Sequence, residues 1–149
     1  MRGKRRGETK RRSSLSLFYF LVSLFSHFTK GVIVHYRETI AWQKAVEMVR
    51  EMYSLVPNLP REETFGIRSQ ITRAAVSVAA NLAEGWARES TKEKSQFLAI
   101  AHGSIAEVET LFTICEQVGW FPQAQTLKVR SLLDELSRMM TTMRRNRRG

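Results

Sequence analysis

Cysteine and histidine are scarce in this chain. Its 149 residues include one cysteine, Cys115, and three histidines, His27, His35 and His102. A single cysteine excludes an internal disulfide, and the scattered histidines complete none of the usual tetrahedral zinc spacings. We therefore expect a reduced, cytoplasmic setting, with Cys115 as a small hydrophobe on the apolar side of its helix.

Sequence signatures of catalysis are also missing. The chain has no Gly-x-x-x-x-Gly-Lys phosphate loop and no Glu-x-x-His pairs of the kind that hold two irons in a bundle. Glu107 and Glu109 point to different sides of a helix, so salt bridges are expected of them and of Glu84. Gly103 and Ser104 lie inside a predicted helix, where they are expected to form a notch for close packing rather than a nucleophile turn. The sequence predicts no enzyme, no cofactor and no metal.

Strand patterns are absent after residue 37, and the three prolines lie outside the helical patterns. Apolar residues recur three and four positions apart, which predicts helices at about 39–55, 62–84, 91–118 and 123–144. Short connections join them. The predicted apolar stripes are, helix by helix, Trp42, Ala45, Val49, Met52 and Val56; Ile67, Ile71, Ala74, Val78 and Leu82; Phe97, Ala101, Ser104, Val108, Leu111 and Cys115; and Leu127, Leu132, Leu133, Leu136, Met139, Met140 and Met143. The expected fold is all-α, an up-down-up-down four-helix bundle over residues 38–145.

The second and third predicted helices form a hairpin around which the rest of the chain is organised. Gly85 is expected to stop the second helix, because glycine tolerates a left-handed backbone. Ser90 and Glu93 form a capping box that starts the third helix, and Gly119 is placed to cap its end. Asn81 lies near the apolar stripe and is expected to fix helix register or the turn, because a buried amide needs a partner.

The net charge of +10 is concentrated at the two ends of the chain. Residues 1–37 hold nine Lys/Arg and one acid, whereas residues 38–141 hold eleven Lys/Arg and thirteen acids. Basic ends suggest a polyanionic partner, nucleic acid or an anionic surface; a solvated solubility tail explains them equally well. Residues 146–149 form the last part of the basic C-terminal tail.

The N-terminal extension, residues 1–37, combines a basic run with the apolar stretch Leu15–Phe28. It imitates a secretory signal, but no small-residue cleavage site follows, and the stretch is shorter than a membrane span. The interpretation we favour is upstream sequence translated from an over-long gene prediction, with Val32 or Val34 as the native start. The extension is expected to be poorly ordered, and no membrane association is expected for the bundle.

Basic residues near the hairpin are the candidates for binding nucleic acid. Arg68 and Arg73 are five positions apart and do not share one helix stripe. A second group lies near the turn, where basic residues alternate with acidic ones. A third group lies in the C-terminal tail. The candidates are Arg68, Arg73, Arg88, Lys92, Lys94, Arg144, Arg145, Arg147 and Arg148. For the cluster near the turn, a solvated surface is an equally good explanation, unless several copies form a ring.

The hairpin also resembles a known bacterial family. The matching residues are Gln70–Ser77, Asn81–Gly85, Phe97–Leu98, Ala101–Ser104 and Glu107–Thr110, with Trp42–Ala45 in the first helix. Together they are similar to the 23S ribosomal RNA intervening-sequence proteins, formerly called S23 ribosomal proteins, and to the accessory variability determinant of diversity-generating retroelements. The resemblance covers about residues 38–143. The family commonly has proline where this chain has Ala79, and alanine should leave the second helix straighter.

The resemblance implies a non-enzymatic bundle, a homopentamer in known members, and in some members a nucleic-acid-binding partner of a reverse transcriptase. The main functional expectation is therefore a homo-oligomer that binds RNA or DNA through basic residues, without reading base sequence. The alternative is a protein-interaction subunit that docks an acidic partner such as a reverse transcriptase.

Overall fold

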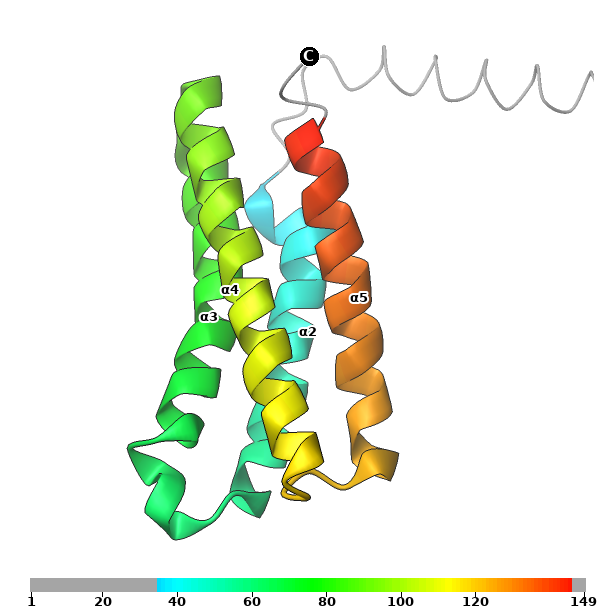
Figure 1. Cartoon of the computed structure of the whole chain (residues 1–149). Coiled ribbons are helices and arrows are strands. Elements are labelled where there is room, and N and C mark those ends of the chain that lie inside the picture. The colour runs from blue at the N-terminus through cyan, green and yellow to red at the C-terminus, as the bar shows by residue number, and fades with distance from the viewer. Residues whose placement is uncertain (1–34, 146–149) are drawn as a thin grey trace, which may run out of the picture. The chain divides into compact units, whose positions relative to one another are not determined.

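The computed structural model describes residues 35–145, which form an all-α bundle of four helices (Figure 1). The helices are α2 (Ile40–Leu55), α3 (Ile67–Ala87), α4 (Thr91–Gln117) and α5 (Gln123–Arg145). Three 3₁₀ turns, η1 (Tyr36–Glu38), η2 (Val56–Asn58) and η3 (Arg61–Thr64), flank or join them, and no strand occurs within this range. The predicted fold class is confirmed. The N-terminal extension up to residue 34, Arg147 and Arg148 lie outside the described residues.

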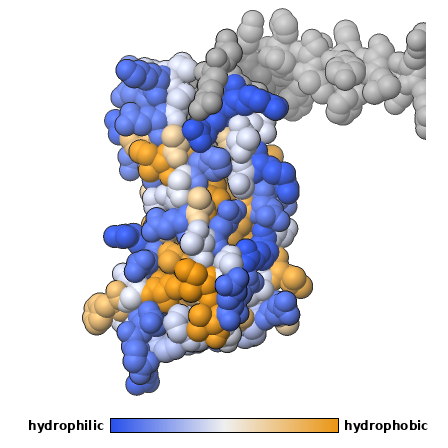
Figure 2. Space-filling view, viewed as in Figure 1, coloured by the Kyte–Doolittle hydropathy of each residue, from blue (hydrophilic) through white to orange (hydrophobic). Residues whose placement is uncertain are grey.

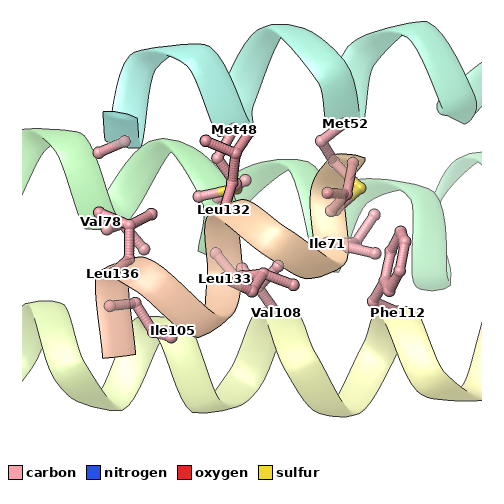
Figure 3. Packing of buried hydrophobic residues seen from close by; sticks show 14 of the residues in the cluster. Met48, Met52, Ile71, Val78, Ile105, Val108, Phe112, Leu132, Leu133 and Leu136 are labelled. Atoms are coloured by element: carbon pink, nitrogen blue, oxygen red, sulfur yellow. The ribbon is translucent and has the colours of Figure 1, made fainter. Parts of the chain in front are cut away.

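Each helix packs against the next one in the chain, and α5 returns to α2, so the bundle is closed. The core consists of apolar side chains that all four helices direct inward (Figure 3). Met48, Ile71, Phe112 and Leu136 have no exposed surface. Burying a side chain of this size stabilises the fold by about 1.5–3 kcal/mol, so the core is the main source of stability.

The predicted apolar stripes match the core in α3 and α4 more closely than in α2 and α5. In α2 the buried positions are Ala41, Ala45, Met48, Met52 and Leu55, so Trp42 and Val49 sit at the edge of the stripe. In α5, Leu127 was expected in the core but is 71% exposed. It follows the buried Thr126 by one residue, and a helix turns by about 100° per residue. Leu127 therefore points away from the core.

Helix α3 starts later and ends later than the sequence suggested. Residues 61–64 form η3, and the Glu63 carboxylate accepts a hydrogen bond from the Ile67 amide at 3.0 Å, at the start of α3. The prediction that Gly85 stops the helix is wrong, because α3 continues to Ala87 and the extended Arg88 follows it. Gly85 is instead buried against α4, where an added Cβ would lie 2.9 Å from the Cβ of Phe97. Glycine fits at position 85 because it lacks a side chain, and not because its backbone can adopt a left-handed conformation.

Both predicted caps of α4 are confirmed. The Ser90 hydroxyl accepts from the Glu93 amide at 3.2 Å and donates to the Glu93 carboxylate at 2.6 Å. At the other end, Gly119 has a φ of +83°, a left-handed conformation that favours glycine. The chain then turns so that Phe121 packs on Phe112, with ring centroids 5.4 Å apart. The two ends of α4 are therefore fixed by local contacts.

Among the described helices, α4 alone has the length and apolar composition of a membrane span. Composition of this kind is also found in core helices of bundles, which are apolar on most sides. Here seven of its residues are buried, and α4 packs against both α3 and α5. These contacts account for the buried part of its apolar surface, while Ile100, Ile114 and Val118 remain exposed.

A partly buried ion pair joins α4 to α5. The Arg130 guanidinium contacts the Glu116 carboxylate, donates to the Thr113 hydroxyl at 3.0 Å and lies 5.0 Å from the centre of the Phe112 ring. Burial opposes ionisation of Glu116, but hydrogen bonds from Arg130 and Thr126 and the charge of Arg130 outweigh it, so the pKa of Glu116 is lowered. The folded state thus favours the ionised carboxylate.

Acid titration of the variant Glu116→Gln should test this pair. A carboxyl with a lowered folded pKa stabilises the fold above its unfolded pKa, and that contribution is lost as pH falls through the folded pKa. We expect the variant to be less stable than the wild type at pH 7, with the difference shrinking below about pH 4.5. Thermal unfolding at a series of pH values measures this, and Glu62→Gln, on exposed η3, is the control. A difference that stayed constant with pH would contradict the assignment.

Candidate nucleic-acid interface

Several predicted basic residues gather at one end of the bundle. The start of α2, the end of α3, the start of α4 and the end of α5 all lie at the upper end in Figure 1. This arrangement follows from the alternating direction of the four helices. The basic end, as we name it, contains Arg88, Lys92, Lys94, Arg144 and Arg145. Residues more than fifty positions apart in the sequence thus share one surface.

Arg88 is anchored at the tip of the α3–α4 hairpin. Its guanidinium lies 3.8 Å from the Glu84 carboxylate and 4.7 Å from the centre of the Phe97 ring. Glu84 therefore forms the surface salt bridge that the sequence analysis expected. Of the other acids at the tip, Glu93 is occupied by the cap, and the hydrogen bond from the Ser90 side chain lowers its pKa. Lys92, in the first turn of α4, is exposed.

The last turn of α5 brings Arg144 beside α4. An Nη1 atom of Arg144 lies 2.9 Å from Nδ1 of His102. His102 is partly buried, and its ring contacts the Arg144 guanidinium at the bundle surface. Arg145 is exposed at the same end. The two arginines extend the basic end across α5.

Arg68 and Arg73 lie elsewhere. Arg68 is in the first turn of α3, about 30 Å along the helix axis from Arg88. Its Nη2 donates to the carbonyl oxygen of Leu59 at 2.7 Å, so the side chain secures the connection between α2 and α3. Arg73 is exposed near the middle of α3. The structure therefore separates these two residues from the other candidates.

A polar chain crosses the close contact between α3 and α4. The Asn81 side-chain amide donates to the Ser77 carbonyl at 2.8 Å and to its hydroxyl at 3.0 Å. The hydroxyls of Ser77 and Ser104 are 2.9 Å apart. Both Asn81 bonds lie within α3, and Ser77 makes the contact with α4; a role of Asn81 in helix register remains a prediction. Sequence reasoning missed Ser77, although its spacing of four from Asn81 places both on one face of α3.

The predicted close-packing notch is correct for Ser104 but wrong for Gly103. Ser104 is buried in the contact with α3, but Gly103 is exposed. A Cβ added to Gly103 would meet no atom within 4 Å. Of the two residues, Ser104 is the one that makes the close contact with α3.

The other described surfaces have few groups of side chains that could bind a metal or act as a nucleophile. Across residues 35–145, no three His, Cys, Asp or Glu side chains are grouped so that they could hold a metal ion. An open groove between α4 and α5 is lined partly by Glu109, Thr113, Arg130 and Asp134. Burial, and then the charge of Asp134, raise the pKa of Glu109 there. Burial also raises the pKa of the Cys115 thiol to about 11, so the thiol stays protonated and a poor nucleophile at neutral pH.

Comparisons with known proteins show which family the chain belongs to. The chain matches the family model described as 23S rRNA-intervening sequence protein over residues 37–142. It is also similar to a solved structure from Bacteroides thetaiotaomicron VPI-5482, described as a protein with unknown function from the S23 ribosomal protein family. That similarity has a TM-score of 0.65 at 20% identity and covers 70% of this chain and 98% of the other, which supports the fold. A search of curated proteins gives no match. Because the family model covers more than half of its length, the chain belongs to the 23S rRNA-intervening sequence protein family.

Proposed function

We propose that this protein is a non-enzymatic homo-oligomer that binds RNA or DNA through phosphate contacts at the basic end. The observation that carries the proposal is that the helix ends carrying Arg88, Lys92, Lys94, Arg144 and Arg145 all lie at one end of the bundle. Some cations along the sides of the bundle are paired with acids, as Lys44 is with Glu135 and Lys128 is with Glu47 and Glu51. Clustered cations attract a polyanion and release its counterions without reading base sequence.

An exposed apolar surface supports assembly into several copies. Phe65 is 95% exposed, and Ile114 and Val118 are 41% and 55% exposed. Figure 2 shows hydrophobic surface over the C-terminal half of α4. Apolar surface that is contiguous tends to be covered by a partner. A second copy of the chain would cover it, and a closed ring would multiply the cations of each basic end.

The salt dependence of binding tests the nucleic-acid proposal. The double variant Lys92→Gln/Arg145→Gln removes two charges from the basic end. We expect weaker binding to any sequence, and a slope of log affinity against log salt that falls by about one for each charge removed. The control is Arg61→Gln, on exposed η3 at the opposite end, which should change neither quantity. Mobility-shift assays from low to physiological salt measure both the affinity and its salt slope. If the wild type did not bind at low salt, the proposal would be rejected.

The apolar surface also fits the alternative, a protein-interaction subunit for a polymerase such as a reverse transcriptase. Sedimentation of the purified chain separates the two uses of this surface. Several copies in one particle support the homo-oligomer. A single copy that binds a purified polymerase after nuclease treatment supports the alternative.

A further inference from the structure

Trp86 is the largest exposed apolar side chain at the basic end, with 42% of its surface exposed. It lies in the last turn of α3, two positions before Arg88. Sequence reasoning placed it in the turn after Gly85. The helix continues to Ala87, so a regular backbone carries the indole and restricts its direction. An aromatic ring on a rigid element is a better stacking surface than one on a loop.

Other aromatic rings and cations lie at the same end of the bundle as Trp86. Arg88 follows the end of α3 and is held by Glu84 and Phe97, on a different side of the helix from Trp86. The turn η1 packs against α3, and its Tyr36 ring contacts the ring of the preceding His35 in a tilted arrangement, with centroids 4.4 Å apart. The Arg37 guanidinium lies 5.7 Å from the centre of the Tyr36 ring. Exposed aromatic rings among clustered cations are the usual composition of a single-strand binding surface.

We propose that the basic end binds single-stranded nucleic acid in preference to duplex, and that an unpaired base stacks on the indole of Trp86. This inference rests on the proposed function, in which cations elsewhere at the basic end hold the phosphates. A duplex exposes its phosphates but covers both faces of each internal base. The cations therefore attract both forms, while Trp86 contributes only when a base is unstacked. Stacking needs a π-face and no particular base, which is consistent with binding that does not read sequence.

The test compares one oligonucleotide as a single strand and as a duplex, in RNA and in DNA, with the full chain. Trp86→Ala should weaken single-strand binding about 5- to 100-fold, which is the range that loss of one stacked base gives. Duplex binding should change less than twofold. The salt slope should stay at the wild-type value, because no phosphate contact is lost. Trp86→Phe keeps an aromatic ring and should recover most of the single-strand affinity.

Tyr53→Ala is the matched control. Tyr53 is an aromatic residue of α2 that is 53% exposed, in the half of the helix farther from the basic end. It should leave both affinities unchanged. Circular dichroism and sedimentation of each variant show whether the fold and the assembly persist.

Two results would overturn the stacking proposal. One is an equal effect of Trp86→Ala on single strand and duplex, or no effect on either, in a wild type that still binds in a salt-dependent way. The other is dissociation of the assembly by Trp86→Ala, which would assign the ring to a contact between copies. In both cases the proposed function stands, whereas a wild type that binds neither form refutes that function itself.

Discussion

Replacing Phe112 with alanine is expected to lower the free energy of unfolding by about 3–5 kcal/mol. Phe112 is among the largest side chains with no exposed surface. It contacts the ring of Phe121 and lies beneath the Arg130 guanidinium, so its loss also weakens the corner after α4 and the contact with α5. Domains of this size are stable by only about 5–15 kcal/mol. Urea unfolding followed by circular dichroism measures the effect.

Ile100→Ala is the matched control for this variant. Ile100 lies in the same helix, α4, is 44% exposed and is not part of the apolar surface proposed for assembly. Its truncation should change the free energy of unfolding by less than about 1 kcal/mol, because a partly exposed side chain leaves no cavity and alanine favours the helix. Equal losses at the two positions would contradict the described orientation of α4.

Gly85→Ala and Gly103→Ala form a second test, in which one substitution is made at two helical glycines. Both variants gain about 1 kcal/mol of helix propensity. At Gly103 nothing opposes this gain, since an added methyl group meets no atom within 4 Å. At Gly85 the methyl group would lie 2.9 Å from the Cβ of Phe97, so α3 and α4 must separate locally.

We expect Gly103→Ala to be more stable than Gly85→Ala by about 1–3 kcal/mol, the usual cost of overpacking. The comparison cancels the propensity term, so the difference reports the steric cost alone. Thermal unfolding of the two variants under identical conditions gives it. If Gly85→Ala were as stable as Gly103→Ala, the close approach of α3 and α4 would be refuted.

The fold could be predicted from sequence because helical periodicity and capping are local signals. The stripe of Ile71, Ala74, Val78 and Leu82 identified the buried face of α3, and Ser90 with Glu93 located the start of α4. The end of α3 could not be predicted in the same way. A glycine near a helix end serves either as a cap or as a space for a neighbouring helix, and only the position of Phe97 decides between them.

The candidate site was predictable only in part. The sequence identified the basic residues, but their grouping depends on the alternating direction of the helices, which brings Arg88 and Arg145 to one end. Arg68 lies far from Arg88 because it is in the first turn of α3, whereas its hydrogen bond to the Leu59 carbonyl joins residues nine positions apart and is not revealed by periodicity. Trp86 was overlooked because the predicted helix stopped before it.

The hydroxyl pair of Ser77 and Ser104 has a mechanical consequence. If α4 slid along α3 by one turn, each partly buried hydroxyl would face apolar neighbours, at about 1–3 kcal/mol for each lost partner. The two helices are thereby locked against longitudinal slippage.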